Sequence, residues 1–318
     1  MKLKEIYELA IETGIKADLR GEDKVQEDLD RLKEKYNKMD EDEKEEFDTE
    51  KLENPYSDTR ILYGDSDREV NKILVGVDID VGEVLIADRL NEKGEGEKVD
   101  LVMAHHPEGK ALAALYQVMH MQEDILHKHG VPINVAEGIM AERISEVERG
   151  IMPLNHNKAR DAARIFDIPL MCVHTPADNL VTSFLQEKID EKDPERVEDV
   201  VKLLKDIPEY KEAVGVKAGP KVVVGSEERR TGKVVVDMTG GTGGSKEAFE
   251  NLSQAGVGTL VCMHIGEEHR EKAEENHINV IIAGHIASDS IGMNLFLDKL
   301  QQNDIEVVPC SGLIRIER

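Results

Sequence analysis

The stretch NVIIAGHIASDSIGMNLFLDKL, residues 279–300, shows in one place how this chain is built. Its beginning is rich in β-branched apolar residues, which is typical of a buried strand, and the remainder has the length of a helix. His285 stands at the junction, the edge at which open α/β sheets bind their ligands. If the helix begins promptly, Asp289 lies one turn after His285 on the same side, so both can hold one ion.

Histidines follow two other predicted strands in the same way. DLVMA (100–104) is followed by His105 and His106, and PLMCV (169–173) is followed by His174. Neighbouring side chains of a strand point to opposite faces, but both members of the first pair can converge where the chain turns. The alternative for this pair is one histidine in the core and one on the surface. Three strand ends that each carry histidine favour a joint metal site.

Asp178 follows His174 by four residues, as Asp289 follows His285. Thr175 is a good N-cap and proline suits the first helical position, which places Asp178 in the first turn of a helix. A carboxylate there can instead serve only the helix dipole, worth about 0.3–1 kcal/mol. The repeated spacing favours metal binding, and the predicted ligands are His105, His106, His174, Asp178, His285 and Asp289.

The composition limits the classes to which this protein can belong. The chain has 318 residues, 40% hydrophobic and 34% charged, which is typical of a soluble globular protein of one large or two ordinary domains. A net charge of −25 and few aromatic residues argue against a nucleic-acid partner. No apolar run is long enough for a bilayer, and the N-terminus lacks the apolar centre of a secretory signal. We therefore expect a cytoplasmic protein without a membrane partner.

The cysteines fit a reducing compartment. There are three, Cys172, Cys262 and Cys310, with no CxxC spacing and each within or beside an apolar stretch. Cys172 and Cys262 each lie two residues before a histidine, which leaves a thiolate ligand as a minor alternative. Zinc–thiolate sites usually come with paired cysteines, so we favour buried free thiols.

Two regions are expected along the chain. Residues 1–54 predict a helical, charge-rich and mostly solvated N-terminal extension. From residue 55 to 318, strands and helices alternate, which predicts an α/β fold with mixed sheets and helical layers. This part can divide into two interleaved subdomains, 55–180 with 280–318, and 181–279. Further predicted strands are KILVGVDID (72–80), EVLIAD (83–88), KVVVDM (233–238) and TLVCM (259–263).

A glycine-rich segment, GGTGGSK at residues 240–246, lies between the predicted strand 233–238 and a predicted helix. Its backbone N–H groups and the helix N-terminus can bind an anion, although it lacks the Walker spacing. The alternative is a tight turn that needs small residues. The candidate binding residues are Gly243, Gly244, Ser245 and Lys246.

Two more residues are candidates for proton transfer. His264 follows the predicted strand 259–263, so it also lies at a strand end. Glu267 comes shortly after it and is the carboxylate best placed by sequence to serve as a base for water activated by a metal.

The three histidine motifs, HHP after a strand, HTxxD after a strand and GHxxxD at the start of the last helix, resemble those of the NIF-three-like dinuclear-metal proteins, a group often described as GTP cyclohydrolase I type 2. The resemblance runs from about residue 60 to the C-terminus. It implies a NIF-three-like α/β fold, a ring-like homohexamer, and two divalent metal ions (Zn, Fe, Mn or Ni) held by the six ligands named above. The family usually has glutamate where this chain has Asp289, and the segment between His106 and His174 looks longer here.

The resemblance and the residues together imply a metal-dependent hydrolase, either cyclohydrolase-like or phosphoester-cleaving. It would use metal-bound hydroxide on a small substrate, which can be phosphorylated or a nucleotide. The alternative is a non-catalytic metal-binding or regulatory oligomeric platform.

Overall fold

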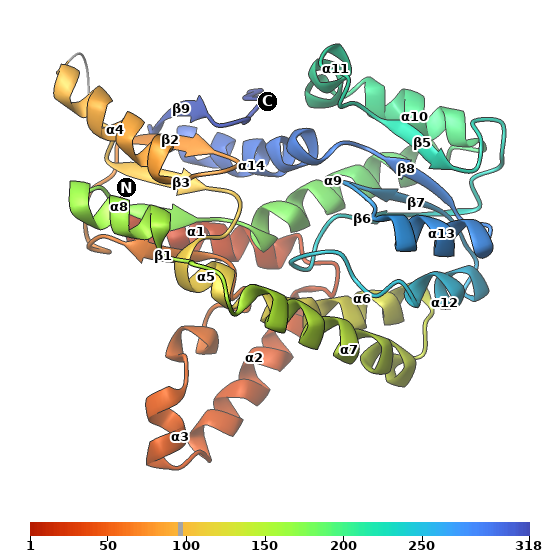
Figure 1. The fold of residues 1–318 in the computed structure, drawn as a ribbon, viewed down its shortest axis with the longest axis horizontal. Helices are drawn as coiled ribbons and strands as arrows, with labels where there is room; N and C mark the ends of the chain where they lie inside the picture. Colours follow the sequence, from red (N-terminus) through yellow and green to blue (C-terminus); the bar gives the residue numbers. More distant parts are fainter. Residues whose placement is uncertain (95–97) are drawn as a thin grey trace.

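In a computed structural model, which describes residues 1–94 and 98–318, the chain forms two β-sheets with helices on both faces of each (Figure 1). Parallel and antiparallel strand pairs occur in both sheets. The predicted α/β class with mixed sheets and helical layers is confirmed. Within the described part of the chain, no helix is long and apolar enough to cross a membrane.

The first sheet has five strands in the order β1-β4-β3-β2-β9. They are β1 (Arg60–Tyr63), β2 (Lys72–Gly76), β3 (Leu101–Ala104), β4 (Leu170–Cys172) and β9 (Glu306–Cys310). All neighbouring pairs are parallel except β1 with β4. Ala104 pairs with both Gly76 and Cys172, so β2, β3 and β4 end at the same level. The residues that follow β3 and β4 therefore meet at one edge.

The second sheet has four strands in the order β5-β8-β7-β6. They are β5 (Lys221–Val224), β6 (Lys233–Asp237), β7 (Val257–Cys262) and β8 (Asn279–Ile282). The three strands β6, β7 and β8 are parallel, and Cys262 pairs with both Asp237 and Ile282. Their carboxyl ends are therefore also level.

Separate sets of helices pack on the two faces of the first sheet. One face packs against α4 (Val81–Lys93), α5 (Gly109–Ala113) and α8 (Lys158–Phe166). The other packs against α1 (Leu3–Lys16), α9 (Thr175–Lys192) and α14 (His285–Gln301). Figure 1 shows α9 and α14 crossing the centre of the molecule between the two sheets.

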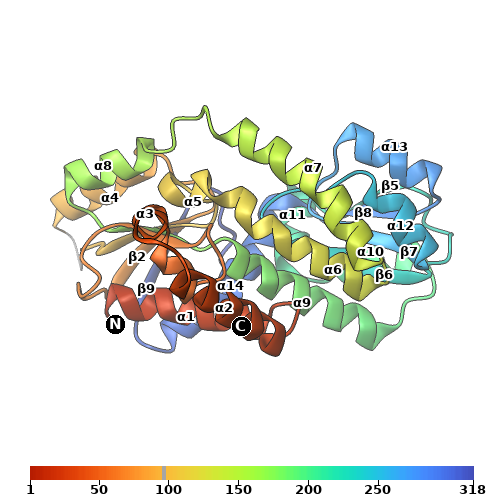
Figure 2. The same ribbon diagram turned by 90° about the horizontal axis from the view of Figure 1, so that it is seen from below.

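The second sheet is covered in the same manner. One face packs against η2 (Leu115–His120), α6 (Met121–His129), α7 (Ile133–Ile151), α12 (Ala248–Gln254) and α13 (Glu267–Glu275). Seen from below, α6 and α7 lie side by side along this face (Figure 2). The other face packs against α9, α10 (Val197–Lys205), α11 (Pro208–Gly215) and α14. The helices α9 and α14 thus contribute to the cores of both sheets.

A glycine sets the distance between α9 and α14. A Cβ atom added at Gly292 of α14 would overlap the backbone carbonyl oxygen of Ala177 in α9. Each of these two residues lies within the first half of its helix, so the N-terminal ends of both helices are close together. Asp178 and Asp289, which lie in these ends, are thereby brought into one place.

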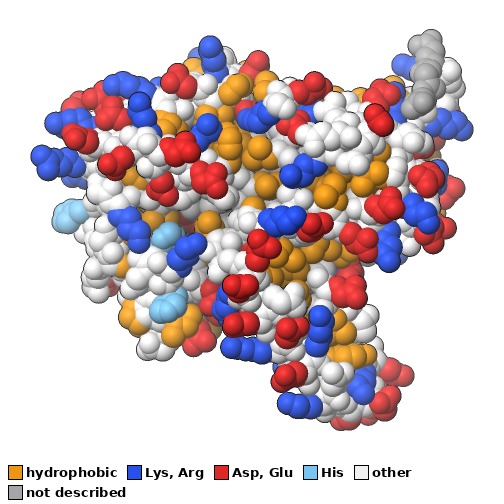
Figure 3. Space-filling view, turned by 180° about the vertical axis from the view of Figure 1, so that it is seen from behind, with side chains coloured by type: hydrophobic (Ala, Val, Ile, Leu, Met, Phe, Trp, Pro, Cys, Tyr) orange, Lys and Arg blue, Asp and Glu red, His pale blue; other side chains and the backbone are white. Residues whose placement is uncertain are grey.

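The N-terminal region is helical, and one part of it packs against the first sheet. Helix α1 buries Leu3, Ile6 and Ala10 completely in the core of the first sheet. Only the following helices, α2 (Glu22–Asn37) and α3 (Glu41–Glu46), with η1 (Thr49–Leu52), have the expected exposure. They project from the body, and charged side chains cover much of the projection in Figure 3.

One predicted strand is a helix. The segment EVLIAD (83–88) lies inside α4, although its β-branched run predicts a strand. Asp80 caps this helix by accepting a hydrogen bond from the N–H of Val81, and the Glu83 carboxylate accepts one from the N–H of Asp80. This capping box outweighs the strand propensity of the run.

Replacing Gly292 with alanine tests the α9–α14 contact. Because the new methyl group would overlap a backbone atom, we expect a loss of stability of about 1–3 kcal/mol, the usual cost of overpacking. Gly138 of α7 is the matched control, since a Cβ there meets nothing within 4 Å. Gly138→Ala should instead stabilise the protein by about 0.5–1 kcal/mol. Denaturant unfolding measures both, and equal effects would contradict this account of Gly292.

Candidate metal centre

The structure brings all six predicted ligands together at the carboxyl ends of β3, β4 and β8. The ring centroid of His105 lies 5.2 Å from that of His106 and 4.9 Å from that of His174. The ring of His106 is also 5.2 Å from that of His285. Two sheets therefore contribute to one cluster, with three histidines from the first sheet and one from the second.

Asp289 lies between the imidazoles. Its Oδ1 is 3.5 Å from Nε2 of His105, and its Oδ2 is 3.6 Å from Nε2 of both His106 and His285. Asp178 makes a similar bridge, with Oδ1 3.5 Å from Nε2 of His105 and Oδ2 3.8 Å from Nε2 of His174. The Asp289 side chain is therefore long enough to face ligands on two sides.

Three overlapping groups have ligand atoms within 4.8 Å of one another, as a metal ion requires. They are His105 with Asp178 and Asp289, His106 with His285 and Asp289, and His105 with His106 and His174. His105, His106 and Asp289 each belong to two of the three groups, so these residues connect them.

The carboxylates fit a cation because they lack other partners. Both oxygens of Asp289 and Oδ1 of Asp178 are buried and have no hydrogen-bond partner among the described residues. Burying such an oxygen without a donor is costly, and a cation removes that cost. Imidazole and carboxylate donors suit Zn, Fe, Mn or Ni and do not select among them. The cluster can therefore hold a metal ion.

In three of the histidines, the ring nitrogen that faces away from the cluster, Nδ1, lies within hydrogen-bond distance of an acceptor. Nδ1 of His105 donates to the carbonyl oxygen of Val173 at 3.0 Å. Nδ1 of His106 lies 2.7 Å from Asp78 Oδ1, and Nδ1 of His174 lies 2.8 Å from Asp58 Oδ2. A proton on Nδ1 leaves the lone pair of Nε2 directed into the cluster, as metal-binding histidines need.

Sequence reasoning missed these acceptors. Asp78 lies just after β2, at the same sheet edge, so the rule that found the histidines applies to it as well. Asp58 precedes β1 in an irregular segment and carries no such signal.

The protonation states suit cation binding. Burial lowers the pKa of His106 to about 4, with help from the neighbouring His105 and His174. Burial alone would raise the pKa of Asp289, but the surrounding histidines outweigh it and lower that pKa. At neutral pH, therefore, His106 is neutral and Asp289 is ionised. Burial raises the pKa of Asp178 well above its usual value, an effect that a bound cation would reverse.

The cluster opens into a cavity of about 690 Å³. His264 lines it, with its ring centroid 5.0 Å from that of His285, so this predicted acid–base residue lies beside the cluster. Glu267 does not reach it, because its carboxylate is 69% exposed and pairs with Arg270 at the start of α13. Glu108, which the sequence did not single out, lines the same cavity, and burial raises its pKa to about 7.

The glycine-rich segment is divided between two cavities. Gly243 lines both the metal cavity and a smaller neighbouring pocket, and Gly244 and Ser245 line only the smaller pocket of these two. Lys246 lines neither of these two cavities, and its Nζ pairs with Glu268 on the surface at 2.7 Å. The α12 helix begins only at Ala248, later than predicted. The structure thus keeps the backbone of this segment near the cluster but not the lysine.

The cysteines do not join the cluster. Cys172 is buried beneath it, where its Sγ lies 3.4 Å from the carbonyl oxygen of Asp58, and burial raises the pKa of this thiol to about 12. Burial also raises the pKa of Cys262. Both thiols are therefore protonated at neutral pH, and neither belongs to the three ligand groups found among the described residues.

One further carboxylate lies at this edge. Asp237 is the last residue of β6, and it lines both the metal cavity and the smaller pocket. Its side chain is exposed to solvent at the end of the strand.

Replacing Asp58 with asparagine tests the support of His174. Because loss of an outer carboxylate weakens a metal-bound histidine, we expect metal affinity to fall by about 10–100-fold. Competition with a chelator, followed by metal analysis of the protein, measures this. The control is Asp42→Asn on the exposed helix α3, which should bind metal as the unaltered chain does. Unchanged affinity in Asp58→Asn would contradict the assigned role.

Comparison with solved structures identifies the fold. The chain is 28% identical to a NIF3 superfamily protein from Sphaerobacter thermophilus, with a TM-score of 0.71 over 81% of this chain and 92% of that one. It shares its fold with the reduced form of HcgD from Methanocaldococcus jannaschii, at 18% identity and a TM-score of 0.50, over 78% of this chain and 87% of that one. No protein-family model and no curated protein matched. In its fold and its strand-end histidines, the chain is therefore similar to the NIF3 superfamily, which the Sphaerobacter protein represents.

Proposed function

We propose that this protein binds two divalent metal ions and acts as a metal-dependent hydrolase on a small substrate. The observation that carries the proposal is the position of Asp289. Its two buried oxygens lack hydrogen-bond donors among the described residues and face imidazoles on opposite sides. A carboxylate so placed can serve two cations at once.

The ligand groups divide naturally between two ions. His105, His174, Asp178 and one oxygen of Asp289 would hold the first, and His106, His285 and the other oxygen would hold the second. With three protein ligands, the second ion would keep positions for water and substrate, which distinguishes catalytic from structural sites. A pair of divalent cations supplies Lewis acidity and activates water for a displacement.

Other residues of the metal cavity supply binding and proton transfer. Arg143 lines the cavity, and its Nε donates to the carbonyl oxygen of Gly243 at 3.0 Å. Its positive charge favours a substrate with an anionic group, such as a phosphate. His264 is close enough to the cluster to take up or release a proton during the reaction. Both a cyclohydrolase-like and a phosphoester-cleaving reaction would use this arrangement.

We also propose that the chain assembles as a homohexamer, as the family resemblance implies. An exposed apolar strip on α4 supports association with other copies. Its residues are 37–47% exposed: Val81, Leu85, Ile86 and Leu90.

The function is tested by measuring metal content and turnover together. Protein loaded with Zn, Fe, Mn or Ni is analysed for metal per chain and assayed on phosphoesters, GTP and cyclic amidines, with and without chelator. We expect two metals per chain and turnover that chelator abolishes. Asp289→Asn should lose metal and lower turnover by about 100-fold or more, because the interaction with both ions is lost.

Glu142→Gln on the exposed side of α7 serves as the control and should retain metal and activity. Two metals without turnover on every substrate would overturn the hydrolase and favour a non-catalytic platform. Unchanged metal content in Asp289→Asn would overturn the site itself.

A further inference from the structure

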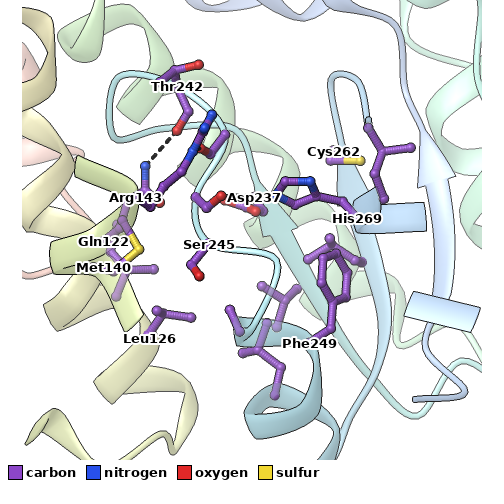
Figure 4. Close-up of a pocket in the computed structure, with 18 of the residues that line it drawn as sticks. Gln122, Leu126, Met140, Arg143, Asp237, Thr242, Ser245, Phe249, Cys262 and His269 are labelled. Atoms are coloured by element: carbon purple, nitrogen blue, oxygen red, sulfur yellow. Dashed lines mark hydrogen bonds between the residues drawn. The ribbon is translucent and has the colours of Figure 1, made fainter. Parts of the chain in front are cut away.

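The smaller pocket, of about 280 Å³, lies beside the metal cavity and within the core of the second sheet. Figure 4 shows Leu126 and Met140 on one side of it and Phe249 on the other. All three side chains belong to the core cluster of this sheet, and none is more than 9% exposed. The chain's own side chains therefore leave space in a part of the protein that is normally close-packed.

The inner part of the smaller pocket is apolar. Arg143 and Asp237 line it, but both lie in the wall that it shares with the metal cavity. Beyond this wall, no Asp, Glu, Lys or Arg among the described residues lines the pocket, whereas Ile125, Leu252 and Leu260 do. An apolar cavity of roughly 150 Å³ in another protein binds benzene, so this space can hold a group of one or two rings.

Specific contacts fix the helices α6 and α7 that form one side of the pocket. At the start of α6, Nε2 of Gln122 donates to the carbonyl oxygen of Gly240 at 2.6 Å. The hydrogen bond of Arg143 to the same glycine-rich segment holds α7. At the end of α6, a Cβ atom added to Gly130 would lie 3.1 Å from Cβ of Ala255, the residue that follows α12. Because α6 is fixed at both ends, the space beside it is a property of the fold.

A purely structural role does not explain this space. A cavity in a core lowers stability by an amount that grows with its volume, because the side chains that line it lose contacts. A longer side chain at Ala248, the first residue of α12, would fill part of the pocket, which alanine lines with a single methyl group. Water is a poor occupant of an apolar cavity. The lining therefore fits an apolar group of a bound molecule.

We propose that the smaller pocket binds an aromatic ring of the substrate. The ring lies between Met140 and Phe249, which line the pocket from opposite sides. Phe249 offers a ring–ring contact and Met140 a thioether–ring contact, and both favour an aromatic group over an aliphatic one of similar size.

The inference deepens the proposed function and rests on it for one point, the position of the reacting end. Arg143 and His264 line both cavities, so a molecule whose ring fills the pocket can extend past them toward the metal cluster. The pocket then favours substrates with an aryl group over those with a short alkyl group, and the cluster acts on the bond beyond the ring.

The probe is 4-fluorobenzyl alcohol, an uncharged ring whose binding to the full chain is followed by fluorine NMR. The titration is carried out on metal-loaded protein and repeated in excess chelator. We expect one probe per chain with the same affinity in both, because the ring does not contact the metal ligands. Cyclohexylmethanol, which has a similar size but no aromatic ring, should displace the probe several-fold less well than benzyl alcohol does. Absence of binding, loss of binding in chelator, or equal displacement by the two alcohols would each overturn the proposal.

Two alanine-to-leucine variants test where the ring binds. Ala248→Leu fills part of the pocket, so it should weaken probe binding by about tenfold or more without lowering the unfolding temperature. Ala136 is the matched control, since it is completely buried in the same core cluster but lines neither cavity. Ala136→Leu should lower the unfolding temperature through overpacking and keep the affinity for the probe. Unchanged affinity in Ala248→Leu, or a loss of stability equal to that of Ala136→Leu, would refute the assignment.

The failure of this pocket and the failure of the proposed function are separable. Asp289→Asn should lose metal and turnover yet bind the probe as the unaltered chain does, since Asp289 does not line the pocket. Benzyl phosphate and methyl phosphate have similar leaving groups, and we expect kcat/KM to favour the benzyl ester by about tenfold, a preference that Ala248→Leu removes. If the probe binds but neither ester is cleaved, the hydrolase fails and the pocket stands. If both esters are cleaved equally and the probe does not bind, the pocket fails and the hydrolase stands.

Discussion

The close approach of α14 to α9 at Gly292 is the constraint on which the metal centre depends. Each helix begins at the end of a strand, α9 after β4 of the first sheet and α14 after β8 of the second. Neither sheet alone could place Asp178 beside Asp289. Contact between the backbones near Ala177 fixes the two helix starts relative to each other, and the two carboxylates with them. The positive ends of both helix dipoles also point at the cluster, which favours the ionised carboxylates.

The helix dipoles alone do not balance the negative charge of the carboxylates in this cluster. Asp289 and Asp58 both raise the pKa of Asp178, in addition to burial, so the carboxylates oppose one another in the absence of a cation. The imidazoles offset part of this repulsion, but His106 is itself neutral at pH 7. A bound cation would pair with the carboxylates that have no donors among the described residues, so metal binding and folding stability should be linked in this protein.

Much of the site could be predicted from sequence because its signals are local. A β-branched run followed by histidine marks a strand end, and the four-residue spacing from His285 to Asp289 marks a helix start. The burial of one face of α1 could not be predicted in this way. Its charged and apolar residues alternate as in a solvated helix, and the partners that bury Leu3 and Ile6 come from α9 and α14, far along the chain. Glu267 was predicted as a base because it is close to His264 in sequence. Its carboxylate is instead exposed and pairs with Arg270, because closeness in sequence does not determine the direction of a side chain.

Both sheets contribute side chains to the metal cavity. The first sheet supplies His105, His106 and His174, whereas the second supplies His285 and, through β6, Asp237. Because the carboxyl ends of both sheets border the same cavity, a small molecule can touch side chains from both. Sequence inspection treats Asp237 as one residue of the strand KVVVDM, with no sign that it faces a pocket. Its position follows from register alone, since Asp237 pairs with Cys262 at the last step of the parallel ladder. At that ladder end the side chain is exposed to solvent and lines the metal cavity, next to the ligands that follow the other strands.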